Sequence, residues 1–153
     1  MVKALLDSSI VMDAMNGVSE ARTEISYYSD ISISAVSWME VAVGCISSNQ
    51  LNQFQAFIGA LGIKVIHTND LVAFEAAKIR AAGLAERPNK RNIKLPDAII
   101  GATGNIDKLM VVTRNPRDFG ASSVRLPYRC EHEYDATGKI IKTTVSDIAC
   151  APV

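Results

Sequence analysis

The chain has few residues that would suit a disulfide framework or a zinc centre. Its 153 residues include three cysteines, Cys45, Cys130 and Cys150, which form no CxxC pair. Because their number is odd and their spacing irregular, a disulfide framework is not expected, and a reducing cytoplasm suits the chain better. The two histidines, His67 and His132, lie far apart in the sequence. We expect both to be ordinary surface or strand-end residues and predict no structural zinc site.

Long apolar runs and an excess of charge are also missing. No apolar stretch approaches the roughly 18 residues that a membrane span needs, and the N-terminus lacks the pattern of a signal peptide. The 16 basic and 16 acidic side chains cancel, so net charge gives no global argument for a nucleic-acid partner. With 48% apolar residues and a mean hydropathy of +0.14, the chain can bury a sizeable core. We therefore expect one soluble cytoplasmic domain with no membrane partner.

Short apolar runs alternate with longer segments of helical periodicity. Five strands are predicted, the last of them short, at residues 2–6, 31–35, 63–66, 109–113 and 124–126. Helices are predicted between them, at residues 10–16, 19–28, 37–47, 49–61, 69–84 and 95–106. Strands that are separated by helices form parallel βαβ units. The pattern therefore predicts an α/β fold with a mainly parallel sheet of four or five strands.

The last part of the chain differs from the rest. Residues 129–135 and 139–145 alternate charged and apolar side chains on either side of Ala136-Thr137-Gly138, as the arms of a β-hairpin do. We expect residues 1–127 to form the main domain and residues 128–153 to be a hairpin extension of it. This hairpin should extend an edge of the sheet or cover a neighbouring element, and we expect it to carry no chemistry.

Four acidic residues lie near the predicted C-terminal ends of strands, where parallel sheets bind their ligands. Asp7 ends the first strand, Glu40 follows the second, Asp97 begins the helix before the fourth, and Asp118 follows the fourth. Because ligands bind outside the C-terminal ends of parallel strands, these four carboxylates are expected to converge. Each acid also has a purely structural explanation. Glu40 fits a capping box with Ser37, Asp97 fits a helix dipole, and the other two fit turns.

Signatures of several other enzyme classes are absent. The sequence contains neither a GxSxG elbow nor a phosphate-binding P-loop. A receiver domain also gathers acids at a sheet edge, but it needs an aspartate after its third strand. In this chain the third predicted strand is followed by His67-Thr68. A serine hydrolase, a P-loop nucleotidase and a receiver domain are therefore set aside.

The motifs around the four acids resemble those of a known family. The stretch LLDSSIVMDAMNG (5–17) is similar to the opening of VapC-type toxin ribonucleases of type II toxin–antitoxin systems, which belong to the PIN-domain superfamily. The next three motifs of that family resemble, in the same order, ISAVSWMEVAVG (33–44), LPDAIIGATG (95–104) and VVTRNPRDFG (111–120). The resemblance covers roughly residues 3–127 and implies a PIN-like three-layer α/β/α sandwich with a nuclease site.

The resemblance also implies a role for each acid. Asp7, Asp97 and Asp118 would hold Mg²⁺ or Mn²⁺, since both ions prefer carboxylate oxygens. Glu40 would bind a second ion or orient the attacking water, so that all four acids are candidate catalytic residues for hydrolysis of RNA phosphodiester bonds. Three further residues would position the cluster through hydrogen bonds: Ser8, Thr113 and Asn115. Ordinary turn and cap chemistry explains these three equally well.

Basic residues near the last two motifs are candidate RNA contacts, because Lys and Arg bind phosphates. They are Arg91, Lys94, Arg114 and Arg117. For any one of them a solvated charged loop is the simpler explanation. The resemblance further implies a cognate antitoxin and a homodimer, for which helices 19–28 and 49–61 offer candidate apolar faces. Two alternatives stay open: a PIN nuclease of RNA maturation outside a toxin system, and a non-catalytic PIN fold that binds RNA or a protein partner.

Overall fold

The main sheet has five parallel strands in the order β3-β2-β1-β4-β5. The computed structural model describes residues 1–85 and 92–153. Its sheet consists of β1 (Ala4–Leu6), β2 (Ile31–Ser34), β3 (Lys64–Ile66), β4 (Met110–Val112) and β5 (Val124–Arg125). Central strand β1 is buried along its whole length, as expected of a parallel strand with helices on both faces. The predicted α/β fold is confirmed.

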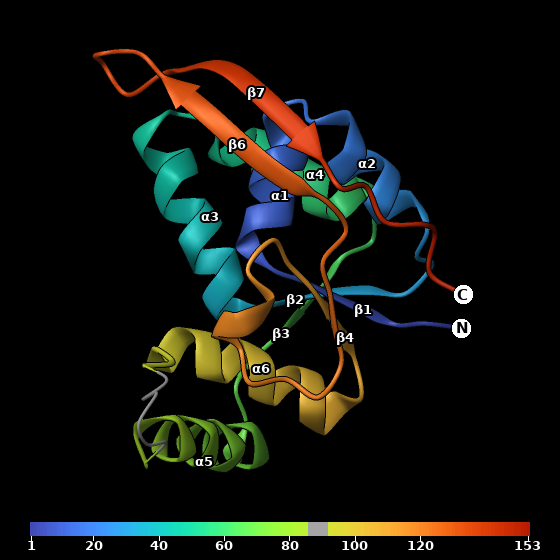
Figure 1. The fold of residues 1–153 in the computed structure, drawn as a ribbon, viewed down its shortest axis with the longest axis vertical. Helices are drawn as coiled ribbons and strands as arrows, with labels where there is room; N and C mark the ends of the chain where they lie inside the picture. Colours follow the sequence, from blue (N-terminus) through green and yellow to red (C-terminus); the bar gives the residue numbers. More distant parts are fainter. Residues whose placement is uncertain (86–91) are drawn as a thin grey trace.

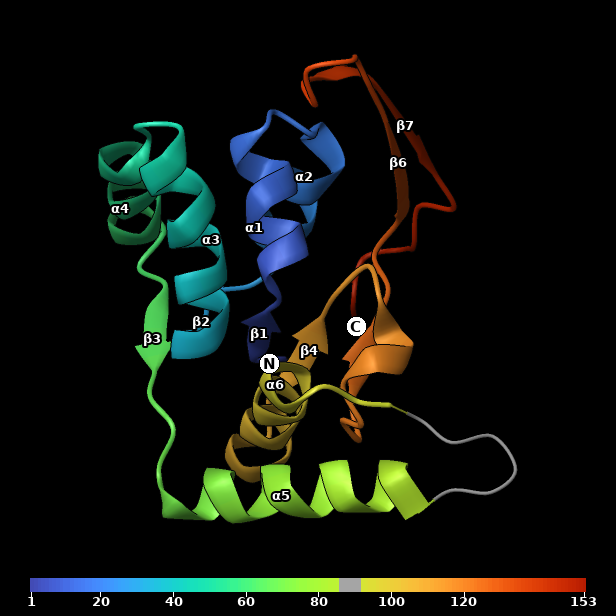
Figure 2. The same cartoon turned by 90° about the vertical axis from the view of Figure 1, so that its left-hand side faces the viewer.

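Helices cover both faces of this sheet (Figures 1 and 2). One face carries α1 (Ser8–Met15), α2 (Ser19–Ser26), α3 (Ala35–Ser47) and α4 (Leu51–Ala60). The other face carries α5 (Asp70–Ala85) and α6 (Leu95–Asp107). The predicted three-layer sandwich is therefore confirmed. None of the helices in the described ranges is long and apolar enough to cross a membrane.

The two faces of β1 pack against two different hydrophobic cores. Leu6 is fully buried in the larger core, together with Ile10 of α1 and Phe54 of α4. Leu5 is fully buried in a smaller core with Ile100 of α6. Successive side chains of a strand point to opposite faces, so one short apolar run supplies both layers. The end of β1 is thereby fixed from both sides.

Helix α6 lies very close to the loop that follows β4. A Cβ atom added to Gly101 of α6 would stand 1.9 Å from the carbonyl oxygen of Phe119. Only glycine permits this approach of helix to backbone. The contact holds α6, which carries Asp97 in its first turn, beside the short helix η1 (Pro116–Asp118). Two acids that are 21 positions apart in the sequence are thus attached to elements in direct contact.

The strand order reverses direction at β1. From β1 the chain proceeds to β2 and β3 on one side, whereas β4 and β5 lie on the other. In open parallel sheets, ligands bind at such a reversal of strand order, outside the C-terminal strand ends. Asp7 directly follows β1, and Thr113 directly follows β4. The topology therefore places both residues at the edge where a site is expected.

The C-terminal hairpin forms a sheet of its own. Strands β6 (Arg129–Tyr134) and β7 (Ile140–Ser146) pair antiparallel and do not join the main sheet. The hairpin crosses the outer side of α1 and α2 (Figures 1 and 2). Cys130 of β6 and Val145 of β7 pack against the larger core. Of the two expected placements, extension of the sheet edge is wrong, and coverage of a neighbouring element is correct.

The expected apolar faces of α2 and α4 are in part buried and in part line an open pocket of about 610 Å³ between the two helices, to which Ile25 and Phe57 contribute. Ile25 of α2 is 3% exposed and Phe54 of α4 is fully buried. Larger exposed apolar side chains lie on α3, where Met39, Val43 and Ile46 are more than half exposed. Their spacing places them on one side of the helix. The stripe on α3 is thus a further candidate surface for a protein partner, beside the pocket between α2 and α4.

Candidate active site

Asp7 is the best-fixed of the four acids. It is 4% exposed and caps the N-terminus of α1, where its Oδ1 accepts a hydrogen bond from the backbone N–H of Ser8 at 2.7 Å. Its Oδ2 accepts from the hydroxyls of Ser9 and Thr113, both at 2.8 Å. Because Thr113 follows β4, this last bond joins the ends of two neighbouring strands. The motif around Asp7 gave no signal for Ser9, whose position at the carboxylate depends on the start of α1.

The capping box predicted for Ser37 and Glu40 is wrong. Helix α3 begins at Ala35, with Ser34 as its N-cap. The hydroxyl of Ser34 accepts a hydrogen bond from a backbone N–H of the first turn, so the end of β2 supplies the cap that was assigned to Ser37. Ser37 lies inside the helix, and its buried Oγ has no hydrogen-bond partner in the described part of the chain. The structural explanation for Glu40 is thereby removed.

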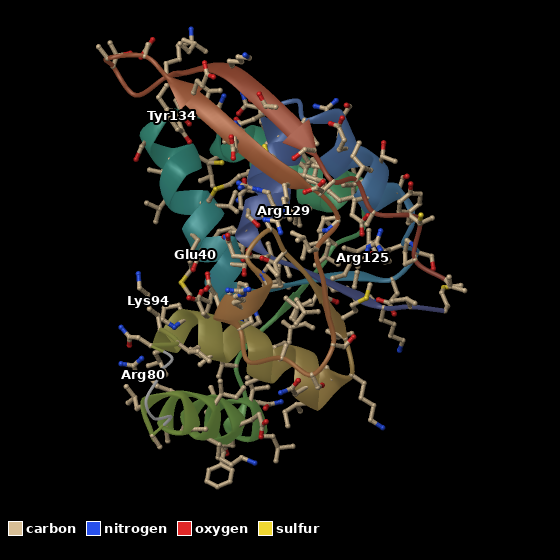
Figure 3. The ribbon with its side chains drawn as sticks, in the orientation of Figure 1. Glu40, Arg80, Lys94, Arg125, Arg129 and Tyr134 are labelled. Atoms are coloured by element: carbon tan, nitrogen blue, oxygen red, sulfur yellow. The ribbon has the colours of Figure 1, made fainter. Side chains whose placement is uncertain are left out.

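Glu40 instead connects to Asp7 through a single hydroxyl. The Oγ of Ser8 donates to Glu40 Oε2 at 2.7 Å and lies 3.4 Å from Asp7 Oδ1. Glu40 lies at the lower end of α3, near the beginning of α6 where Lys94 is placed (Figure 3). Ser8 is thus the residue that holds the acid of the second motif beside the acid of the first.

The electrostatics of Asp97 place all four acids in one site. The pKa of Asp97 is raised from 3.8 to about 6, first because burial disfavours its charge and then because Asp118, Glu40 and Asp7 repel it. Lys94 acts in the opposite direction and lowers the pKa. A carboxyl group that is perturbed by three other carboxylates belongs to a cluster of like charge. Such clusters are typical of functional sites.

Asp118 reaches the cluster through a turn that begins at Thr113. The backbone N–H of Asn115 donates to Thr113 Oγ1 at 3.0 Å, and the N–H of Asp118 donates to the carbonyl oxygen of Asn115 at 3.2 Å. Asn115 therefore contributes to positioning through its backbone. Asp118 itself is exposed. The buried hydroxyl of Thr113 supports Asp7 on one side and the turn that leads to Asp118 on the other.

The cluster is open rather than tightly drawn together. In residues 1–85 and 92–153, three ligand atoms of His, Cys, Asp or Glu lie within 4.8 Å of one another only at Asp13, Cys130 and His132. The four acids are spaced more widely. Oxygen ligands of one Mg²⁺ ion lie within about 4.2 Å of one another, so the acids as placed would reach one ion partly through the water molecules that Mg²⁺ keeps. All donors in the cluster are carboxylate oxygens, which also suit Mg²⁺ or Mn²⁺.

A basic pocket adjoins Asp118. It has a volume of about 390 Å³, and its lining includes Asp118, Arg117 and Arg129. Arg129 comes from the hairpin and is exposed (Figure 3). No pattern in the sequence indicated it, because its place beside the pocket depends on how the hairpin folds back. Of the predicted RNA contacts, Arg117 and Lys94 are exposed, and Arg91 lies outside the described residues.

Arg114 has a different environment from the other predicted contacts. Its Nε lies 2.7 Å from Oδ2 of Asp13, an acid of α1 that is 1% exposed, and the Arg114 side chain is itself only 23% exposed. The hydroxyl of Tyr128 donates to the same carboxylate at 2.8 Å. The guanidinium of Arg114 therefore pairs with a buried acid, although the residue also lines the basic pocket beside Asp118.

Comparison with known proteins points to one family. A family model described as PIN domain matches residues 4–121. A toxin–antitoxin complex from Klebsiella pneumoniae contains a chain with 31% identity and a TM-score of 0.69, over 83% of this chain and 99% of that one. DNA-bound VapBC from Salmonella typhimurium gives 24% identity and a TM-score of 0.65, over 82% and 98%. FitAcB from Neisseria gonorrhoeae gives 21% and 0.66, over 81% and 97%. None of the curated proteins matches the chain.

Proposed function

Because the chain belongs to the PIN-domain family, we propose that it is a divalent-metal-dependent endoribonuclease and the toxin of a toxin–antitoxin pair. The observation that carries the proposal is the convergence of Asp7, Glu40, Asp97 and Asp118, expressed in the raised pKa of Asp97. The match to a chain of a toxin–antitoxin complex at 31% identity supports the toxin setting. A nuclease of RNA maturation and a non-catalytic fold are the rival functions.

The proposed mechanism gives each acid a role. Asp7, Asp97 and Asp118 would hold Mg²⁺ or Mn²⁺, directly or through water, and Glu40 would bind a second ion or orient the attacking water. When bound, the ion activates that water and neutralises charge that develops on the scissile phosphate. Ser8 keeps Glu40 in place by its 2.7 Å hydrogen bond, and Thr113 keeps Asp7 in place by its 2.8 Å bond. Such supporting bonds strengthen and orient metal ligands.

We propose that RNA phosphates bind in the basic pocket beside Asp118. Arg117 and Arg129 line this pocket and are exposed, and Lys94 stands at the start of α6 next to Asp97. Arg114 also lines the pocket, but its guanidinium pairs with Asp13, so it is not assigned to phosphate. Replacement of Arg129 by alanine should raise KM for all RNA sequences alike and make binding less dependent on salt. Lys139→Ala, at the exposed end of the same hairpin, is the control and should change neither.

The partner surface is proposed on α3. Met39, Val43 and Ile46 form an exposed apolar stripe there, and a cognate antitoxin or a second copy of this chain would cover it. Val43→Lys should then reduce association in light-scattering measurements of the mass of the free chain or of its complex. If the mass of both is unchanged, the stripe is not the interface.

Cleavage and growth together test the proposed activity. Purified protein should cut RNA with Mg²⁺ or Mn²⁺ and lose this ability in EDTA. Asp97→Asn should abolish cleavage, whereas Asp107→Asn, the same substitution about 15 Å away on the same helix, should leave it intact. Expression of the wild type and of the Asp107 variant should arrest bacterial growth, and the Asp97 variant should not.

Each rival function predicts a different result. Cleavage without growth arrest would favour a nuclease outside a toxin system. RNA binding without cleavage by any ion would favour a non-catalytic fold. Cleavage that persists in EDTA, or equally in the Asp97 variant, would contradict the role of the acids.

A further inference from the structure

Three different metal-binding side chains meet between the hairpin and α1. Asp13 of α1 is 1% exposed, and Cys130 and His132 both belong to β6. Residues two apart on a strand point to the same face, so Cys130 and His132 face α1 together. One ligand atom from each of the three residues lies within 4.8 Å of the other two. The hairpin, which we expected to carry no chemistry, thus contributes two of three potential ligands.

The distances match the edges of a tetrahedral zinc site. His132 Nε2 lies 3.7 Å from Cys130 Sγ and 3.4 Å from Asp13 Oδ1. Zinc binds sulfur at about 2.3 Å and nitrogen or oxygen at about 2.0–2.1 Å. At tetrahedral angles these bond lengths separate neighbouring ligand atoms by roughly 3.3–3.6 Å. Without an ion, His132 Nε2 pairs with Asp13 and lies at hydrogen-bond distance from the thiol of Cys130, so all three ligand atoms already converge on one point.

The outer contacts of His132 and Asp13 are those that orient metal ligands. The other ring nitrogen of His132, Nδ1, lies 2.9 Å from the hydroxyl of Thr143 on β7. The other oxygen of Asp13, Oδ2, accepts a hydrogen bond from Tyr128 and pairs with Arg114. Partners on the far side of histidine and carboxylate ligands fix their orientation toward the ion. An ion would replace the direct contacts of His132 Nε2 with Asp13 Oδ1 and Cys130 Sγ, and the 3.3 Å contact of Arg114 Nη2 with Asp13 Oδ1.

We propose that Asp13, Cys130 and His132 bind one Zn²⁺ ion, with a water molecule as its fourth ligand. A thiolate, an imidazole and a carboxylate form a set that suits zinc, whereas the all-oxygen acid cluster suits Mg²⁺. The thiol proton of Cys130 is released to solvent when the ion binds. The site joins the hairpin to α1. Two of its ligands lie beyond residue 121, where the match to the family model ends, and the site is independent of the proposed nuclease function.

Titration with Co²⁺, a spectroscopic substitute for Zn²⁺, tests the site directly. The folded wild-type protein should bind one equivalent with a sulfur-to-cobalt charge-transfer band, and Zn²⁺ should displace the Co²⁺. Cys130→Ser should abolish the band, and His132→Gln should weaken affinity by at least about a hundredfold. The chain supplies matched controls, Cys150→Ser and His67→Gln, which should leave both band and affinity unchanged.

A labelling experiment on the wild-type protein tests the site even if one of the variants does not fold. One equivalent of Zn²⁺ should protect Cys130 of the wild type from alkylation by iodoacetamide, while the exposed Cys150 stays reactive. Asp97→Asn should show the same protection, because the acid cluster is a separate site. Absence of the charge-transfer band in folded wild type, equal Zn²⁺ affinity in Cys130→Ser, or labelling of Cys130 that Zn²⁺ does not slow would each overturn the proposal.

Discussion

Asp97→Asn should stabilise the protein when no divalent metal is present. In the folded protein the pKa of Asp97 is raised from 3.8 to about 6 by burial and then by Asp118, Glu40 and Asp7. The charged form of Asp97 therefore destabilises the folded protein at neutral pH. Asparagine keeps the shape of the side chain and removes the charge, so the variant no longer bears this repulsion. A residue that serves only as a helix cap would show the opposite effect.

The sign and size of the effect follow from the pKa difference. As pH rises, Asp97 ionises at a pKa near 3.8 in the unfolded chain but keeps its proton to about pH 6 in the folded protein. Its contribution to stability is thus fully present below pH 3.8 and is lost as pH rises through about 6. A difference of about two pKa units corresponds to about 3 kcal/mol. Because this side chain is partly exposed, solvent screening reduces the expected effect to about 1–2 kcal/mol.

Urea unfolding in EDTA at a series of pH values measures the effect. The difference in free energy of unfolding between Asp97→Asn and wild type should be smallest near pH 4 and should reach about 1–2 kcal/mol in favour of the variant at pH 7.5. Asp107→Asn on the same helix should show no such pH dependence. Mg²⁺ should then stabilise the wild type more than the Asp97 variant. A difference that is constant with pH, or a less stable Asp97 variant at pH 7.5, would refute the reasoning.

Two further substitutions test how the framework is held. Gly101→Ala should lower the free energy of unfolding by at least about 2 kcal/mol in chemical denaturation, because its Cβ would meet the carbonyl oxygen of Phe119. The control is Gly44→Ala on α3, where the added Cβ meets no other atom; this substitution should raise the free energy of unfolding by up to about 1 kcal/mol. Arg125→Met should cost about 3–5 kcal/mol in the same measurement at pH 7, because it leaves Glu24, which is 3% exposed, without its 2.6 Å ion pair; a loss below 1 kcal/mol would show that water reaches this acid.

Most of the framework could be predicted from local patterns. The strands and helices were placed within a few residues, because apolar periodicity reports which face of an element is buried. Helix α3 shows the limit of such reasoning. The sequence pattern indicated Ser37 as the cap, whereas the structure has Ser34 there, at the end of β2. The residue at which α3 begins determines where Glu40 lies relative to Ser8, and the sequence around neither residue predicts that position.

The missing parts of the site depend on contacts between distant segments. Asp13 and Arg114 are 101 positions apart, and Tyr128 reaches the same carboxylate from further along the chain. His132 was expected to be an ordinary surface or strand-end residue, yet its side chain is only 10% exposed because the hairpin folds onto α1. Arg129 enters the basic pocket for the same reason. No local pattern carries such information, since it arises from how the hairpin packs.

The strand order also determines when the acidic cluster is completed during translation. A ribosome releases the N-terminus first. Asp7, which follows β1, and Glu40, which lies in the helix after β2, therefore emerge early. The other neighbour of β1 is β4, which begins at Met110. Before that segment has emerged, Thr113 cannot support Asp7, and neither β4 nor Asp118 is in place. A nascent or prematurely terminated chain therefore carries an incomplete cluster, and hydrolytic activity should arise only when nearly the whole PIN domain has left the ribosome.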